Sequence, residues 1–365
     1  MSVIRSVTVK LQLLPCGASA LRDTMRAYTE AFTASARWGF ANHTYNKVRN
    51  HAATYRDVRT SIPNLPSSLV QGARDCACDA LKATKCTRLP ERRPFAAIRY
   101  NQRVVRVSLL HGFASIATTS GRVRAEFTLP DCYRQYVEGT IKSSTLSYTN
   151  RHFYLHVQIE LPTPNQTDIV RVLGIDRGMK NVAVCSDSSF FNARTTRAIR
   201  GRHQHLRADL QSKGTRSAKR KLKRLSGRER RFMTDINHCI SKQIANSEYT
   251  IFALEDLSKI RVQKRRGTEF NRNLNGWSFY QLEQFLRYKS ESLGKSVVLV
   301  DARYTSQKCS KCGHVYKGNR HGSQFICRNC GFELHADLNA ARNIAHAGIS
   351  GVGRLPVNQP NVACL

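Results

Sequence analysis

The sequence predicts a multidomain α+β protein, in which an N-terminal β-barrel-like domain carries a helical insert and a C-terminal α/β domain carries a cysteine-rich insert. Three observations support this division. Residues 3–14 and 95–161 alternate apolar and polar side chains as half-buried strands do. Residues 18–89 repeat apolar side chains at helical spacing, and buried strand patterns alternate with long helical runs after residue 169. A chain of 365 residues is long enough for two or three domains.

The composition is strongly basic, with 59 Lys and Arg against 25 Asp and Glu and a formal net charge of +34. An excess of this size indicates an extended polyanion as partner, most plausibly nucleic acid. A membrane surface fits less well, because no basic amphipathic anchor stands out and no apolar run approaches the ~20 residues of a spanning helix. The N-terminal residues alternate like a strand and lack a signal-peptide pattern. We therefore expect an intracellular protein, in the cytoplasm and associated with the nucleoid.

The predicted barrel-like domain consists of residues 1–14 and 95–165. Its later part contains several short apolar runs separated by turn signals such as Gly112, Pro130 and Asn150. Because consecutive strands tend to be neighbours, we expect the opening strand to lie beside the strand that follows the insert and to complete the sheet.

The helical insert is predicted over residues 15–94. Its apolar residues recur at helical spacing, and Ser67 and Ser68 are candidates to cap its later helix. Pro90 and Pro94 close the insert. Its basic and aromatic side chains are candidates to face a nucleic acid, although most of them have ordinary explanations as core aromatics and solvated charges.

The α/β domain is predicted over residues 166–303 and 332–348. Within it, Arg194–Arg231 contains 15 Lys and Arg but only two acids. Because like charges at this density repel one another, we expect this run to contact phosphates. The basic loop at 259–277 is expected to be mobile or ordered by a ligand, and residues 349–365 to form a poorly ordered tail.

Four cysteines have the spacing of a zinc ribbon, C-x2-C-x14-C-x2-C, and a glycine that permits a tight turn follows each pair. Four thiolates saturate tetrahedral zinc, so we expect a structural site, held by residues 304–331. The other eight of the 12 cysteines are expected to be ordinary thiols. The predicted zinc ligands are Cys309, Cys312, Cys327 and Cys330.

Three acids, Asp176, Glu255 and Asp337, stand where a strand ends or a helix begins. Each alone has an ordinary explanation, as a turn residue, an ion-pair partner and a helix N-cap respectively. Taken in order, they can converge at one end of an RNase H-like sheet, where three carboxylates bind two Mg²⁺ ions that clamp a phosphodiester. Weaker candidates near other strand ends are Asp187, Asp256 and Asp301.

Four motifs together resemble a known family: GIDRG (174–178), ALEDL (253–257), the cysteine ribbon and HADLNAARNI (335–344). The sequence resembles the TnpB (OrfB) proteins of IS200/IS605 and IS607 transposons, which are related to the Cas12 nucleases. The resemblance is close over about Val170 to Ala347, and in the N-terminal half it extends only to the organisation of the domains.

The resemblance implies an RNA-guided DNA endonuclease whose partners are a guide RNA from the transposon end and double-stranded target DNA. It implies a wedge domain (1–14 and 95–165), a recognition insert (15–94) and a RuvC-like nuclease domain (166–303 and 332–348). The zinc ribbon (304–331) would bind the target nucleic acid.

The family's motifs give Asp176, Glu255 and Asp337 as the catalytic acids that bind Mg²⁺. They also make Arg342 and Asn343 candidates to orient phosphate or metal-bound water. The sequence leaves the oligomeric state open, and a monomer is favoured.

Three other functions remain open at this point. The chain could be a repressor that keeps RNA-guided DNA binding without cleavage, although the intact set of acids argues against it. It could be a compact Cas12-type CRISPR effector, which differs in the source of its RNA. A DDE-like transposase would join strands as well as cut them.

Overall fold

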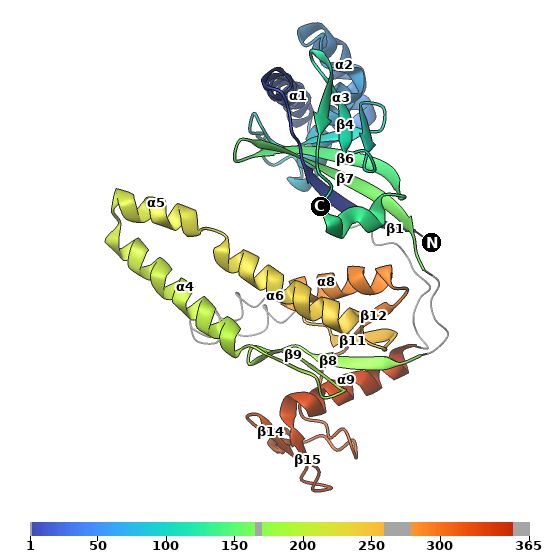
Figure 1. Cartoon of the computed structure of the whole chain (residues 1–365), viewed down its shortest axis with the longest axis vertical. Helices are drawn as coiled ribbons and strands as arrows, with labels where there is room; N and C mark the ends of the chain where they lie inside the picture. Colours follow the sequence, from blue (N-terminus) through green and yellow to red (C-terminus); the bar gives the residue numbers. More distant parts are fainter. Residues whose placement is uncertain (1, 165–169, 259–278, 353–365) are drawn as a thin grey trace. The chain divides into compact units, whose positions relative to one another are not determined.

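The structure, a computed structural model, describes residues 2–164, 170–258 and 279–352 of the chain. It contains two compact units, Met1–Pro162 and Thr163–Leu365 (Figure 1). The expected ligand-ordered loop at 259–277 and most of the expected tail lie outside the described residues.

The first unit contains a four-stranded antiparallel sheet in the order β1-β7-β6-β2. β1 pairs with β7 along its whole length, from Ser2 opposite Pro162 to Lys10 opposite Tyr154. The predicted alternation is present, because every buried apolar residue of β1 faces the same core. The strands are β1 (Ser2–Lys10), β2 (Ile98–Asn101), β6 (Thr140–Thr149) and β7 (His152–Pro162).

A second sheet of three short antiparallel strands follows the order β3-β4-β5. An isolated bridge between Gln12 and Glu126 links it to the chain just after β1. The expected barrel therefore corresponds, in the described residues, to two sheets linked by this bridge, with the short helix η1 (Asp131–Tyr136) between β5 and β6. The strands are β3 (Val105–Ser108), β4 (Phe113–Thr118) and β5 (Gly121–Glu126).

The prediction that the opening strand lies beside the strand after the insert is wrong. β2 pairs with β6, while β1 pairs with β7, so β1 and β2 form opposite edges of the sheet. The lengths of the strands explain this arrangement. β7 has 11 residues and can satisfy the backbone of all nine residues of β1, whereas β2 has only four.

The insert is helical, as predicted, and its helices α1 and α3 share a core with the two sheets. α1 contributes Leu21, Met25, Tyr28 and Phe32, whose spacing places them on one buried face. The predicted caps are wrong, because α3 begins at Ser67 without a side-chain cap and Ser68 accepts a hydrogen bond from Asn101 instead. The helices are α1 (Pro15–Ala41), α2 (Lys47–Ser61) and α3 (Ser67–Ala83).

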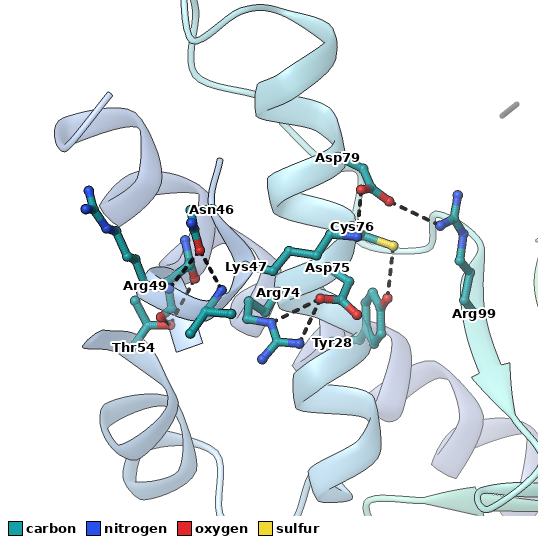
Figure 2. Close-up of polar contacts among 12 residues, drawn as sticks. Tyr28, Asn46, Lys47, Arg49, Thr54, Arg74, Asp75, Cys76, Asp79 and Arg99 are labelled. Carbon is teal, nitrogen blue, oxygen red and sulfur yellow. Dashed lines mark hydrogen bonds and ion pairs between the residues drawn. The ribbon is translucent and has the colours of Figure 1, made fainter. Parts of the chain in front are cut away.

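Polar contacts connect these helices to each other and to the sheet, as Figure 2 shows. Asp79 on α3 forms ion pairs with Lys47 on α2 (3.0 Å) and with Arg99 on β2 (3.4 Å). The hydroxyl of Tyr28 on α1 donates to the sulfur of Cys76 at 3.3 Å. The ion pairs are half exposed, and each contributes little to the free energy of folding. The shared apolar core therefore stabilises the helix packing, and the ion pairs add orientation.

The second unit is built on a five-stranded sheet in the order β10-β9-β8-β11-β12. β8, β11 and β12 are parallel, and β9 returns antiparallel to β8 as the predicted hairpin. The three predicted strands are confirmed, and β8 and β11 are buried as expected, but β12 is a half-buried edge strand with Leu299 40% exposed. β10 is a strand that the sequence pattern did not predict. The strands are β8 (Val172–Asp176), β9 (Asn181–Cys185), β10 (Phe190–Asn192), β11 (Ile251–Glu255) and β12 (Ser296–Val300).

Helices cover both faces of this sheet (Figure 1). α6 and α8 pack on one face through Ile240, Ile244 and Leu286, while α9 packs on the other through Ile344. Gly214 and Gly227 have positive φ and separate α4, α5 and α6, as predicted. The helices are α4 (Arg194–Lys213), α5 (Arg216–Leu225), α6 (Arg228–Ala245), α8 (Phe279–Ser292) and α9 (Ala336–Val352).

The cysteine-rich segment forms a small three-stranded sheet just before α9. Its third strand ends at His335, beyond the predicted boundary at residue 331. α9 continues to Val352, so the first residues of the predicted tail are helical. The elements of this segment are η2 (Lys317–Asn319), β13 (Arg320–His321), β14 (Gln324–Ile326) and β15 (Glu333–His335).

Gly174 in β8 is a point of close approach between the sheet and the backbone of α9. A Cβ atom there would lie 2.0 Å from the carbonyl oxygen of Ala341 and 2.4 Å from the backbone nitrogen of Ala345. Both are backbone atoms, so no side-chain rotation can relieve the clash. The absence of a side chain at Gly174 therefore sets the packing distance of α9, and with it the position of Asp337 in the first turn of that helix.

We expect Gly174→Ala to destabilise the protein by about 1–3 kcal/mol or more, because α9 must shift away from β8. The matched control is Gly201→Ala, an exposed position in α4 where the added Cβ would meet nothing within 4 Å. It should be neutral or stabilising by up to about 1 kcal/mol. Denaturant unfolding of both variants measures the difference, and equal stabilities would contradict the packing argument.

Candidate functional site

The three predicted acids lie together at the end of the five-stranded sheet of the second unit where β8 and β11 finish. Asp176 and Glu255 are the last residues of β8 and β11, two parallel neighbours whose preceding residues, Ile175 and Leu254, are directly paired. The two carboxyl groups therefore leave the sheet side by side. Asp337 enters from the first turn of α9, and the amide of Asn181, the first residue of β9, donates to its Oδ2 at 2.9 Å.

The three carboxyl groups interact electrostatically. Burial, together with the negative charges of Glu255 and Asp337, raises the pKa of Asp176 from 3.8 to about 8. Burial also raises the pKa of Glu255, against a hydrogen bond from Thr305 and the charges of Arg177 and Arg320. These shifts show that the carboxyl groups, when all are ionised, repel one another more strongly than Arg177 and Arg320 compensate.

Glu255 is held in place from two sides. The hydroxyl of Thr305, a buried residue just before the first zinc ligand, donates to Glu255 Oε1. The guanidinium of Arg177 donates to the backbone carbonyl of Glu255. Sequence reasoning did not single out either residue, although both belong to the motifs that carry the resemblance.

Arg177 is itself fixed by a buried ion pair. Its Nη1 lies 3.1 Å from Glu283 Oε2 on α8 and donates to the carbonyl of Phe279 at the same distance. The arginine side chain is fully buried and that of Glu283 is 9% exposed. Removing one partner would leave an unpaired charge in the core, which typically costs about 3–5 kcal/mol. Arg177 therefore ties the ends of β8 and β11 to α8.

Asp337 forms an ion pair with Arg320, whose Nη2 lies 2.7 Å from Asp337 Oδ1. Arg320 belongs to the cysteine-rich segment, 17 residues before Asp337. The sequence offers no periodicity that connects the two residues. As a result, both carboxylate oxygens of Asp337 accept a bond from a protein donor.

The three weaker candidates have a different role. Each carboxylate accepts a hydrogen bond from the backbone N–H two residues later, at 2.9–3.0 Å, which is the geometry of an Asx turn. These contacts give each of the three acids a structural role at the end of its strand. The residues are Asp187, Asp256 and Asp301.

Asn343, expected to orient phosphate or water, is instead buried and bonds the backbone of the segment before the first cysteine pair. Its amide donates to the carbonyls of Thr305 and Lys308 at 2.9 and 2.6 Å. One turn earlier, Asn339 donates to the same Lys308 carbonyl and accepts from the N–H of Ser310. α9 therefore anchors the chain that leads into the first cysteine pair.

The four predicted zinc ligands come together in one cluster, with their sulfur atoms within 4.8 Å of one another. Two of the sulfur–sulfur distances, Cys309 to Cys330 and Cys312 to Cys327, are 3.8 and 3.6 Å. A tetrahedron with Zn–S bonds of ~2.3 Å has edges of about 3.8 Å. These distances are too long for disulfides (~2.05 Å) and suit a closed tetrathiolate zinc site.

The two cysteine pairs adopt the same turn. In each, the first cysteine donates its N–H to a carbonyl five residues later and accepts at 2.9 Å from the N–H of the glycine, Gly313 or Gly331. Both glycines have positive φ, which explains the glycine after each pair. The thiols of the cluster shift in different directions: a hydrogen bond from the backbone of His314 lowers the pKa of Cys312 to about 6, while burial raises the pKa of Cys309.

α5 carries six cations within the basic run Arg194–Arg231. Among the described residues, none of the six cations of α5 forms an ion pair, and four residues of the helix line an open hollow of about 590 Å³. On α4 and α6, by contrast, Arg200 and Arg207 pair with Glu229. The unpaired cations of α5 are therefore available for phosphate groups. The residues that line the hollow are Ser217, Arg220, Lys223 and Arg224.

None of the helices in the described part of the chain is both long enough and apolar enough to cross a membrane.

Two family models match the second half of the chain. The model OrfB_IS605, described as "Probable transposase", matches residues 155–265, and the model "Cas12f1-like, TNB domain" matches residues 279–344. The first match includes Asp176 and Glu255. The second includes the four cysteines and Asp337, so the matched segments contain every predicted site residue.

Known proteins give the same picture. The CRISPR-associated endodeoxyribonuclease Cas12f1 of Sulfoacidibacillus thermotolerans is 31% identical over 242 residues, which is 59% of this chain and 55% of that protein. InsQ of Escherichia coli (strain K12) is 29% identical over 234 residues, 58% of each chain. The chain therefore spans little more than half the length of these relatives.

A solved structure matches over almost the whole chain. The Cas12f1 protein in a complex with single guide RNA and target DNA superposes with a TM-score of 0.62, covering 94% of this chain and 98% of that chain at 12% identity. At this identity the match establishes a shared fold. The resemblance seen in the motifs is thus confirmed by segment matches, relatives and fold.

We expect Asp176→Asn to stabilise the metal-free protein at pH 8. The folded-state pKa of Asp176 lies above its unfolded value, so its contribution to stability is complete below about pH 4 and is lost as the pH rises through about 8. Asparagine removes this loss, and the melting temperature should rise by at least about 2 °C. The control Asp301→Asn, whose carboxylate is exposed, should not raise it, and a pH-independent effect at position 176 would contradict the explanation.

We expect Cys309→Ser to lose bound zinc and to unfold the ribbon, because zinc supplies much of the folding energy of a small closed site. Elemental analysis should find one zinc per chain in the wild type and well under one in the variant. Cys132→Ser, which changes an exposed cysteine outside the cluster, should keep the zinc. Full zinc content in the Cys309 variant would contradict the assignment.

Proposed function

We propose that this chain, a member of the TnpB (OrfB) family and a relative of the Cas12f proteins, is an RNA-guided DNA endonuclease. It would cut target DNA next to a short flanking motif by Mg²⁺-dependent hydrolysis of phosphodiester bonds. The observation that carries this proposal is the convergence of Asp176, Glu255 and Asp337 into one partly buried cluster whose negative charges repel one another when ionised. A cation would relieve this repulsion, and hard carboxylate oxygens favour Mg²⁺.

The order of the sheet supports an RNase H-like, RuvC-type nuclease domain. Numbered along the unit, its strands lie in the order 3-2-1-4-5, with the second strand antiparallel to the first. This order places strands 1 and 4, which end in Asp176 and Glu255, at the centre. With the boundaries that the structure gives, we assign residues 166–303 and 336–352 to the nuclease domain and 304–335 to a ribbon that binds target nucleic acid.

In the N-terminal unit we assign residues 1–14 and 95–165 to a wedge domain and 15–94 to a recognition insert. The shared fold with the Cas12f1 chain supports this division. The partners we propose are a guide RNA from the transposon end and double-stranded target DNA. The net charge of +34 and the unpaired cations of α5 are consistent with both polyanions.

The residues around the acids have separate roles in this proposal. Asp176, Glu255 and Asp337 would hold Mg²⁺, which when bound polarises the phosphate and supplies an activated water. Thr305 and Arg177 keep Glu255 directed toward the site, and Asn181 orients Asp337. The zinc cluster would hold the ribbon in shape and take no part in the chemistry.

Two alternative functions share this geometry, and an assay is needed to distinguish them from the proposed function. An RNA-guided repressor would bind target DNA without cutting it, and the complete set of acids argues against this alternative. A compact Cas12-type CRISPR effector would use the same site with an RNA from a CRISPR array. Sequencing the RNA that co-purifies with the protein identifies the source of the guide.

We expect the protein loaded with its co-purifying RNA to cut matched DNA in Mg²⁺, and Asp176→Ala to cut at less than about 1% of the wild-type rate while keeping DNA affinity. The matched control is Asp301→Ala, which changes an exposed Asx-turn acid at the same sheet edge and should cut normally. Cleavage kinetics and filter binding measure the two quantities. Equal cutting by wild type and Asp176→Ala would refute the nuclease assignment, and joined products would indicate a transposase.

A further inference from the structure

Arg320 is a residue of the ribbon whose positive side chain contacts the acid cluster. It lies between the two cysteine pairs, at the start of β13, and its guanidinium contacts Asp337 at 2.7 Å. Arg177, the other cation near the acids, is fully buried and committed to Glu283. The side chain of Arg320, in contrast, is 33% exposed and can move into solvent.

A divalent ion that binds Asp337 meets two donors that already contact the carboxylate, Arg320 at one oxygen and Asn181 at the other. Each carboxylate oxygen has a second lone pair, so a hydrogen bond alone does not exclude a metal. The neutral amide of Asn181 tolerates a nearby metal, but the guanidinium of Arg320, 2.7 Å from Oδ1, repels it. The charge of Arg320 is therefore the feature that opposes a metal at Asp337.

The zinc site controls where Arg320 stands. Asn319, the preceding residue, is fully buried. Its amide donates to the carbonyl of Gln307, and its Oδ1 accepts from the N–H of Arg328, the residue after the third zinc ligand. The backbone that carries Arg320 is thus tied to both cysteine pairs. Its own Nε bonds the carbonyl of Gly322 at 3.2 Å and shapes the turn.

We propose that Arg320 is a built-in counter-cation, which the zinc ribbon holds on Asp337 in the metal-free protein and which a divalent ion displaces when it binds. The ribbon thereby opposes loading of the acid cluster with metal. This inference rests on the proposed function only in that it takes the three acids to be a divalent-metal site. It predicts that zinc and the second metal compete through Arg320, at separate sites.

The test measures Mn²⁺ binding to the zinc-loaded full chain without nucleic acid. Electron paramagnetic resonance reports the concentration of free Mn²⁺. The wild type should show a site that Asp176→Asn removes. Arg320→Gln should lower the Kd of this site about five- to tenfold, because it removes one positive charge from the carboxylates. Arg320→Lys, which keeps the charge, should stay within about twofold of the wild type.

Lys317→Gln is the matched control, since it removes one positive charge from the ribbon at a residue that forms no ion pair within the described part of the chain. It should leave the Kd unchanged. Zinc content and thermal unfolding establish that each variant is folded. An unchanged or higher Kd in Arg320→Gln overturns the proposal, as does an effect of equal size in Lys317→Gln.

The same experiment separates the inference from the proposed function. If the wild type has no Mn²⁺ site that depends on Asp176, the nuclease site fails and the inference fails with it. If the site exists but Arg320→Gln does not change it, only the inference fails. Removing zinc from the wild type should lower the Kd for Mn²⁺. Removing zinc from Arg320→Gln should have little further effect on this Kd. If zinc removal lowers the Kd equally in the wild type and in Arg320→Gln, the proposed coupling between the ribbon and the acids is overturned.

Discussion

The central constraint on the second unit is the crowding of three partly buried carboxyl groups that repel one another when ionised. Asp176 and Glu255 leave adjacent parallel strands side by side, and α9 adds Asp337 to the same edge. Burial strengthens the repulsion because it removes the water that would screen these charges. Arg177 and Arg320 offset part of the charge without neutralising it. The remaining imbalance is what the proposed function attributes to a cation site, in contrast to a structural network of balanced ion pairs.

The neighbouring contacts keep this unfavourable arrangement in place. Gly174 allows α9 to approach β8 closely, and the buried pair of Arg177 and Glu283 fixes the ends of the central strands to α8. Asn339 and Asn343 fasten the entry of the ribbon to α9. The folding free energy of these contacts, rather than any attraction among the acids, holds the carboxylates together. The zinc cluster and the acid cluster are thus parts of one framework that have different chemistry.

Much of this framework could be predicted from the sequence, because its signals are local. Buried strands that end in Asp176 and Glu255 are visible as apolar runs, and the spacing of the cysteines is specific to a tetrathiolate site. The contact between Arg320 and Asp337 could not be predicted, because it depends on how a ribbon without helical or strand periodicity folds over α9. The pairing of β1 with β7 was missed for a similar reason, since relative strand length decided it and not proximity along the chain.

The overall charge of the chain and the charge of the site have opposite signs, and this contrast matters for the proposed function. A polyanion is attracted to a protein of net charge +34, yet a phosphodiester brought to the three acids would add a further negative charge to an edge that is already too negative. Binding of a phosphate at the acids therefore requires positive charge beyond the part that Arg177 and Arg320 supply. A divalent ion provides two charges where Arg320 provides one. In the proposed function, exchange of Arg320 for a divalent ion would change the site from one that is only partly neutralised into one that can accept phosphate.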